Sequence, residues 1–139
     1  MVVTIPAWNG PTGGVPDGIV FNPTTDFELA TGKKAIFIFS TEDGTISGWN
    51  PGVDPTNAVI KVNNWPVAVY KGLALASAGG ANYLYAANFR AGTVAPFPLK
   101  FTDIGVALSW VRVLLGRRLR DYVHISLTDC SQFDDTRPF

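Results

Sequence analysis

An all-β fold is the class that this sequence predicts, from its composition and from its spacing of turn residues. The chain has 139 residues, of which 47% are hydrophobic, 12% aromatic and only 16% charged. Such a chain can fill one core with β-favouring side chains. Fourteen glycines and ten prolines supply frequent turns, and short apolar runs alternate with them up to about residue 97. We therefore expect antiparallel strands in residues 1–97 and a compositionally different tail in 98–139.

Four expected strands follow one another in the first half of the chain. They are Gly18–Phe21, Ala35–Phe39, Thr45–Trp49 and Ala58–Val62. Tight connectors stand beside them at Asn22-Pro23, Glu42-Asp43-Gly44 and Asn50-Pro51-Gly52. Because these residues tolerate positive φ or fix φ at a negative value, the chain is expected to reverse direction at each of them.

An internal repeat refines this expectation. Residues 37–46 align with 84–94 after one insertion, and Gly18–Phe21 aligns with Gly72–Leu75. Both copies continue through Gly-Thr to an aromatic residue, Trp49 or Phe97. A period of about 50 residues with four strands per unit is typical of a β-propeller blade, whereas a β-sandwich has no reason to repeat this order. The sequence predicts a partial β-propeller of about two four-stranded antiparallel blades in residues 1–97.

The same segments resemble an uncharacterised bacterial family of predicted β-propeller proteins, related in blade pattern to NHL-repeat propellers. The resemblance covers about residues 2–94, and residues 41–49 are its most recognisable part. It implies a six-bladed type of propeller of unknown biochemical role and no established catalytic residues. It also implies an extracellular or cell-envelope location, because full-length members are often exported, although residues 1–6 do not have the pattern of a secretory signal.

Residues 98–139 form an atypical tail without the blade pattern. This tail holds five of the six arginines, the single histidine His124 and the single cysteine Cys130. A foreign, frame-shifted or truncated ending would explain the break in composition. Apolar residues at helical spacing predict a short helix over about 106–119, although the β-branched content also fits a strand. Neither His124 nor Cys130 has the sequence partners of a catalytic triad or a disulfide, so neither receives a role.

Five polar residues are the candidates for the mouth of the propeller channel: Asp17, Glu42, Asp43, Asn88 and Arg90. Carboxylate and amide oxygens in such a place could hold Ca²⁺, which takes roughly six to eight oxygen ligands. Too few carboxylates are present for that number. Asp17 and Asp43 are therefore expected to be turn formers, and no metal site is predicted.

Two classes of function remain open. The first is a non-enzymatic interaction or extracellular scaffold module, and the second is the remnant of a Ca²⁺-dependent, lactonase-like propeller hydrolase. The first is preferred, since the second needs converging carboxylates. The formal net charge of zero gives no overall electrostatic case for nucleic acid, and no apolar run reaches the roughly 20 residues of a membrane span.

Two isolated blades leave two open sheet faces, which favours two kinds of partner: the remaining blades of a longer parent chain, or self-association. The tryptophans are expected to pack between blades rather than to form a sugar-stacking surface. They are Trp8, Trp49, Trp65 and Trp110.

Overall fold

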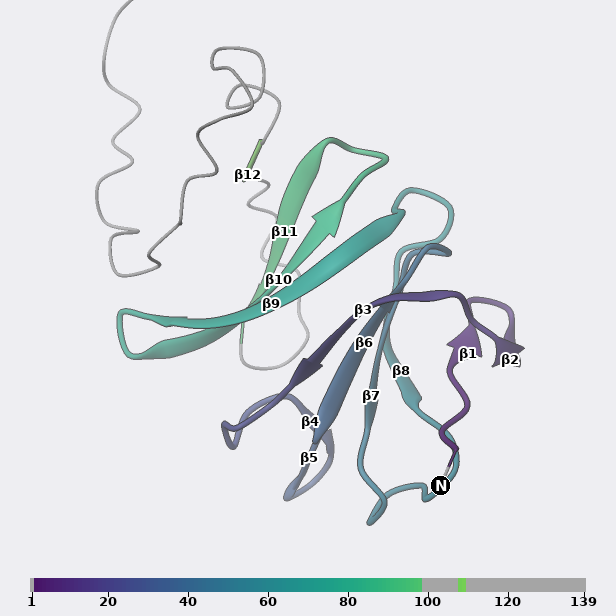
Figure 1. The fold of residues 1–139 in the computed structure, drawn as a ribbon. Coiled ribbons are helices and arrows are strands. Elements are labelled where there is room, and N and C mark those ends of the chain that lie inside the picture. Colours follow the sequence, from purple (N-terminus) through teal and green to yellow (C-terminus); the bar gives the residue numbers. More distant parts are fainter. Residues whose placement is uncertain (1, 99–107, 110–139) are drawn as a thin grey trace, which may run out of the picture.

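The computed structural model describes residues 2–98, 108 and 109, and these residues form an all-β fold without a helix (Figure 1). Two four-stranded antiparallel sheets make up most of it, and two short hairpins accompany them. The all-β expectation is confirmed. In the described part of the chain, no helix is therefore long and apolar enough to cross a membrane.

The first sheet has the strand order β3-β6-β7-β8. Its strands are β3 (Pro16–Phe21), β6 (Phe37–Thr41), β7 (Thr45–Trp49) and β8 (Val59–Asn63). All four expected strands are present, with bounds that differ by up to two residues. The β6–β7 turn reverses at Gly44, whose φ of 81° lies in the left-handed region that glycine adopts readily.

The second sheet repeats this arrangement with the order β9-β10-β11-β12. Its strands are β9 (Tyr70–Ala78), β10 (Ala81–Asn88), β11 (Thr93–Pro98) and β12 (Leu108–Ser109). The helix predicted over 106–119 is wrong at Leu108 and Ser109, which pair with Val94 and Thr93 on the edge of β11. Pairing gives the backbone groups of that edge hydrogen-bond partners, which a helix would not do. The rest of that range lies outside the described residues, as do His124 and Cys130.

Equivalent residues of the repeat occupy equivalent places in the two sheets. Three side chains lie in one cross-strand row of each sheet: Phe21, Phe37 and Trp49 in the first, and Leu75, Leu84 and Phe97 in the second. The next row follows the same rule, since Ile19 faces Phe39 and Leu73 faces Ala86. The sequence repeat is thus a repeat of strand order and of register.

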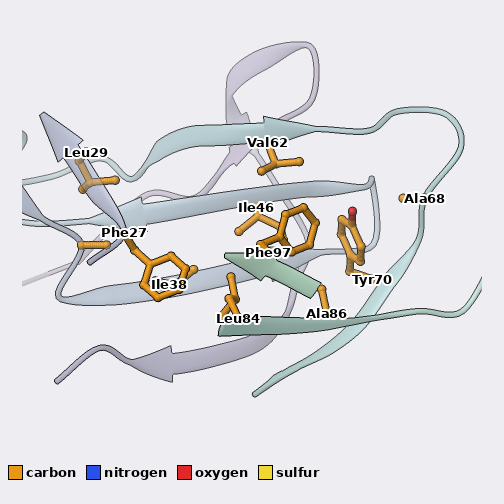
Figure 2. Close-up of a cluster of buried hydrophobic side chains, with 11 residues drawn as sticks. Phe27, Leu29, Ile38, Ile46, Val62, Ala68, Tyr70, Leu84, Ala86 and Phe97 are labelled. Atoms are coloured by element: carbon orange, nitrogen blue, oxygen red, sulfur yellow. The ribbon is translucent and has the colours of Figure 1, made fainter. Parts of the chain in front are cut away.

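The two sheets pack through a shared apolar core, with their first strands β3 and β9 next to each other. Figure 2 shows side chains from both sheets entering this cluster, including Ile38 and Ile46 from the first and Leu84 and Phe97 from the second. Gly18 permits the close approach of the first strands. A Cβ atom at this position would lie only 2.9 Å from the backbone nitrogen of Leu73.

A hairpin between β3 and β6 has no counterpart in the second sheet. It consists of β4 (Glu28–Ala30) and β5 (Lys33–Lys34), and it delivers Phe27, Leu29 and Ala35 to the core. Gly48 of β7 makes room for this hairpin, since a Cβ there would lie 2.7 Å from the side chain of Leu29 and 2.8 Å from that of Ala35.

Asn22 holds the start of this hairpin in place, at the connector that the sequence predicts. Its side-chain amide donates to the carbonyl oxygens of Asp26 at 2.8 Å and Ala35 at 2.9 Å. Its Oδ1 accepts from the backbone nitrogen of Thr24 at 3.0 Å. The buried amide thus satisfies backbone groups in a loop that has no ladder partners there.

The tryptophans divide into two groups. Trp49 is buried, but it lies in the row of Phe21 and Phe37 and does not belong to the core cluster between the two sheets; Trp110 lies outside the described residues. The expectation of packing between blades is wrong for Trp8 and Trp65, which stack on each other with ring centroids 4.7 Å apart and remain 38% and 46% exposed. Trp8 joins the hairpin strands β1 (Pro6–Ala7) and β2 (Gly10–Gly13), and Trp65 lies in the loop before β9, so neither belongs to a sheet row.

Candidate functional site

Asp17 and Lys71 occupy equivalent places at the beginning of the two first strands. Each residue directly precedes the repeated glycine, Gly18 or Gly72. At both places the ladder between the first and second strands has an irregular register, between Pro16 and Gly18 in the first sheet and opposite Ala86 and Asn88 in the second. Such bulges redirect a side chain and occur often beside functional sites. The two residues therefore project from one end of the two-sheet unit.

Lys71, Asp17 and Glu42 form a charge cluster at this end. The ammonium nitrogen of Lys71 lies 3.5 Å from Oδ2 of Asp17, and it donates a hydrogen bond to Oε1 of Glu42. All three side chains are partly exposed, so water weakens the attraction. The hydrogen bond to Glu42 raises the pKa of Lys71 above its ordinary value of 10.5, desolvation partly opposes this rise, and the negative charges of Glu42 and Asp17 add to it.

Asp43 follows Glu42 but serves the turn and the N-terminal hairpin. Its Oδ1 accepts a hydrogen bond from the Thr41 hydroxyl and lies 3.5 Å from that of Thr45. Its Oδ2 accepts from the backbone nitrogen of Trp8 at 2.8 Å. Asp43 therefore fixes the β6–β7 turn and connects it to the segment before β2, and the structure does not bring it into the cluster around Lys71.

Asn88 ends β10, and Arg90 lies in the turn between β10 and β11. Oδ1 of Asn88 accepts from the backbone nitrogens of Val69 at 3.1 Å and Ala91 at 3.3 Å, so this side chain joins the turn to the start of β9. Arg90 is exposed in the same turn. Of the five residues predicted for the channel mouth, the structure thus brings Asp17 and Glu42 into one charge cluster.

Lys71 is the member of this cluster that sequence reasoning missed. Its signal is positional, because it stands before Gly72 as Asp17 stands before Gly18. Its ammonium group lies close to both carboxylates and offsets half of their charge. Among the residues that the structure describes, no three His, Cys, Asp or Glu side chains gather closely enough to hold a metal ion together.

A pocket of about 330 Å³ lies beside Asp17, on the face of β3 that points away from the shared core. Its lining consists of Val3, Ile5, Pro16, Asp17, Gly18, Ile19 and Phe39. Asp17 is the charged member of this otherwise mainly apolar lining. The pocket thus joins the apolar outer face of the first sheet to the charged end at Lys71.

Comparison with known proteins gives distant and partial matches. The chain is 35% identical over 80 residues to the uncharacterized protein L690 of Acanthamoeba polyphaga mimivirus, and 34% identical over 80 residues to the uncharacterized protein R648 of the same virus. Each match covers 53% of this chain, but only 20% and 19% of the two viral proteins. The chain thus spans about a fifth of these relatives. No protein-family model matches it, and no solved structure matches it.

Proposed function

We propose that the two four-stranded sheets are consecutive blades of a partial β-propeller, and that the chain acts as a non-enzymatic interaction or scaffold module. The observation that carries this proposal is the repeated unit itself. Both units have the same strand order, matching cross-strand rows and an irregular register at Asp17 or Lys71. Their first strands are neighbours, as the innermost strands of adjacent blades are.

The charged end supports an interaction function. Asp17, Glu42 and Lys71 reach this end from two different sheets, so a partner that binds there contacts both units at once. Their partial exposure leaves hydrogen-bonding capacity for a polar partner. The family resemblance extends this proposal to a six-bladed type of propeller that works outside the cell or in its envelope.

The position of Lys71 beside Asp17 and Glu42 is the reason to prefer this function over a Ca²⁺-dependent hydrolase. A calcium ion bound by Asp17 and Glu42 would have to displace the ammonium group of Lys71, which already offsets half of their charge. Two carboxylates supply only part of the roughly six to eight oxygens that the ion takes. The same end of the unit is therefore built to present charges rather than to bind a hard cation.

Thermal unfolding with and without micromolar Ca²⁺ tests this proposal, with Mg²⁺ as the ionic control. We expect no change in Tm. A ligand that binds only the folded state at about 100 times its Kd stabilises by about 2.7 kcal/mol, which raises Tm by roughly 10 °C or more in a domain of this size. Such a rise with Ca²⁺, abolished by Asp17→Asn together with Glu42→Gln, would reject the scaffold in favour of the hydrolase.

A further inference from the structure

We infer that the outer face of the first sheet binds a second copy of this chain, head to tail, through the far face of the second sheet. The outer face is the side of the first sheet that carries Ile19, Phe21, Phe37 and Phe39. The far face is the side of the second sheet that carries Ala74, Tyr83 and Tyr85. This inference rests on the blade arrangement proposed above, because it extends the contact between the two sheets to a third.

The residues of the outer face are equivalent, in the repeat, to the residues through which the second sheet packs against the first. Leu73, Leu75, Leu84, Ala86, Ala95 and Phe97 of the second sheet belong to the shared core or pack against it. Their equivalents in the first sheet are Ile19, Phe21, Phe37, Phe39, Ser47 and Trp49. Five of these six are apolar. Ser47 and Trp49 are already buried within the chain and Phe37 and Phe39 are half-buried, whereas Ile19 and Phe21 remain 62% and 58% exposed. An apolar sheet surface of this kind marks an interaction site.

The far face of the second sheet offers the complementary positions. Val20 and Ile38 place the first sheet against the second, and their equivalents on the far face are Ala74 and Tyr85. The glycines show the same relationship. A Cβ at Gly18 would meet the backbone of β9, whereas a Cβ at Gly72 would meet nothing within 4 Å.

Charge complementarity favours the head-to-tail order. Within one chain, Asp17 of the first sheet pairs with Lys71 of the second at the charged end. If a second copy continues the series, its Asp17 comes next to Lys71 of the first copy, so the same attractive pair forms again. An association of two outer faces involves the first sheets of both copies, so it would not form a new pair between Asp17 of one copy and Lys71 in the second sheet of the other.

A second copy is the occupant because every chain carries both halves of a contact that it already makes internally. Such a contact between two different faces is heterologous, so it generates closed rings or open filaments rather than a two-fold dimer. The exposed apolar side chains of the outer face would then lose contact with water, which is the main driving force for association.

Complementation between two variants tests the inference by sedimentation velocity of the 139-residue chain. Ile19→Asp places a charge on the outer face, and Gly72→Val adds bulk to the far face at a position open in the single chain. We expect the native chain to form a concentration-dependent series of oligomers and each variant alone to remain monomeric. An equimolar mixture of the two variants has one intact pair of faces, so it should form a 1:1 dimer that stops there.

Circular dichroism and thermal unfolding at low concentration verify that both variants are folded. A native chain that stays monomeric up to its solubility limit would overturn the inference. Oligomers that persist in Gly72→Val but disappear in Ile19→Asp would also overturn it, since they would show contact between two outer faces. Neither result bears on the proposed packing of the two sheets inside one chain. Gly18→Ala and Gly72→Ala test that packing independently.

Discussion

The close approach of β3 and β9 makes Gly18→Ala a test of the arrangement of the two sheets. The added methyl group would lie 2.9 Å from the backbone nitrogen of Leu73 and 3.1 Å from the carbonyl carbon of Gly72. Neither backbone atom can rotate away as a side chain can, so the two sheets must separate locally. Overpacking of this kind costs about 1–3 kcal/mol.

Gly72→Ala is the matched control, since its methyl group would enter open space. A glycine replaced by alanine without strain gains roughly 0.4–1 kcal/mol, because the unfolded chain has fewer conformations to lose. With about 2 kcal/mol for the Gly18 variant and roughly 4–8 °C per kcal/mol, Gly18→Ala should lower Tm by about 8–16 °C. Gly72→Ala should leave Tm unchanged or raise it by a few degrees.

A variant at Ser40 separates a side-chain clash from a backbone clash at Gly18. Its hydroxyl would lie 2.6 Å from the new methyl group, and it is buried without a hydrogen-bond partner among the described residues. If this hydroxyl caused the clash, Ser40→Ala would rescue Gly18→Ala. We expect little rescue, because the backbone of β9 remains in place. Thermal and urea unfolding at low protein concentration, where association is weak, compares the variants. Equal losses at Gly18 and Gly72, or full rescue by Ser40→Ala, would refute the proposed contact between first strands.

Three further predictions concern individual side chains. Phe97→Ala should cost about 3–5 kcal/mol in urea unfolding, because this ring is fully buried between the sheets, and a loss below about 1 kcal/mol would contradict that burial. Hydrogen bonds from the backbone of Thr56, from the Asn57 side chain and from the Asn57 backbone lower the pKa of Asp54 below 3.8. The ionised Asp54 therefore stabilises the folded chain above pH 3.8, and this stabilisation is lost as pH falls through the pKa of the folded state. Asp54→Asn should therefore reduce the acid dependence of the urea midpoint below about pH 4, and an unchanged profile would contradict this. The raised pKa of Lys71 has the opposite effect on stability. The charged Lys71 makes a small contribution to the stability of the folded chain below pH 10.5, and this contribution is lost as pH rises through the higher pKa of the folded state. Lys71→Gln should therefore flatten the alkaline part of the plot of urea midpoint against pH, relative to the native chain.

Most of the fold of the described residues could be predicted, because each repeat copy gives independent evidence for the same strands. The run Thr45–Trp49 is a strand with the predicted bounds, and the alignment of Phe37 with Leu84 corresponds to the observed registers. The β4–β5 hairpin could not be found in this way, because the second unit replaces it by a tight turn at Gly79 and Gly80. A repeat says nothing about what is inserted in one of its copies.

The charge cluster was predictable only in part, for a related reason. Turn chemistry pointed to Asp17 and Glu42 as single residues, but the cation that joins them comes from the other unit. Lys71 differs in charge from its equivalent Asp17, so a search for repeated residue types passes over it. The relevant signal is a position repeated before each glycine, Gly18 and Gly72, with the sign of the charge reversed.

The two ends of the pair of sheets differ in how closely the sheets resemble each other, and this difference supports the charged end as the proposed interaction site. At the end opposite the charge cluster, one sheet has the β4–β5 hairpin and the other a two-glycine turn. At the charged end, the side chain that closes the second strand fixes the following turn in both sheets. Thr41 accepts from the backbone nitrogen of Thr45 at 3.0 Å, and Asn88 accepts from that of Ala91 at 3.3 Å. Hydrogen-bonded turns thus lie at equivalent places in both sheets, at the end where β3 carries Asp17 and β9 carries Lys71. A partner that binds at the proposed site needs these charges as well as the fold. Reversing all three, by Asp17→Lys, Glu42→Lys and Lys71→Glu, keeps opposite charges next to each other, so it should preserve Tm and still abolish binding at this end.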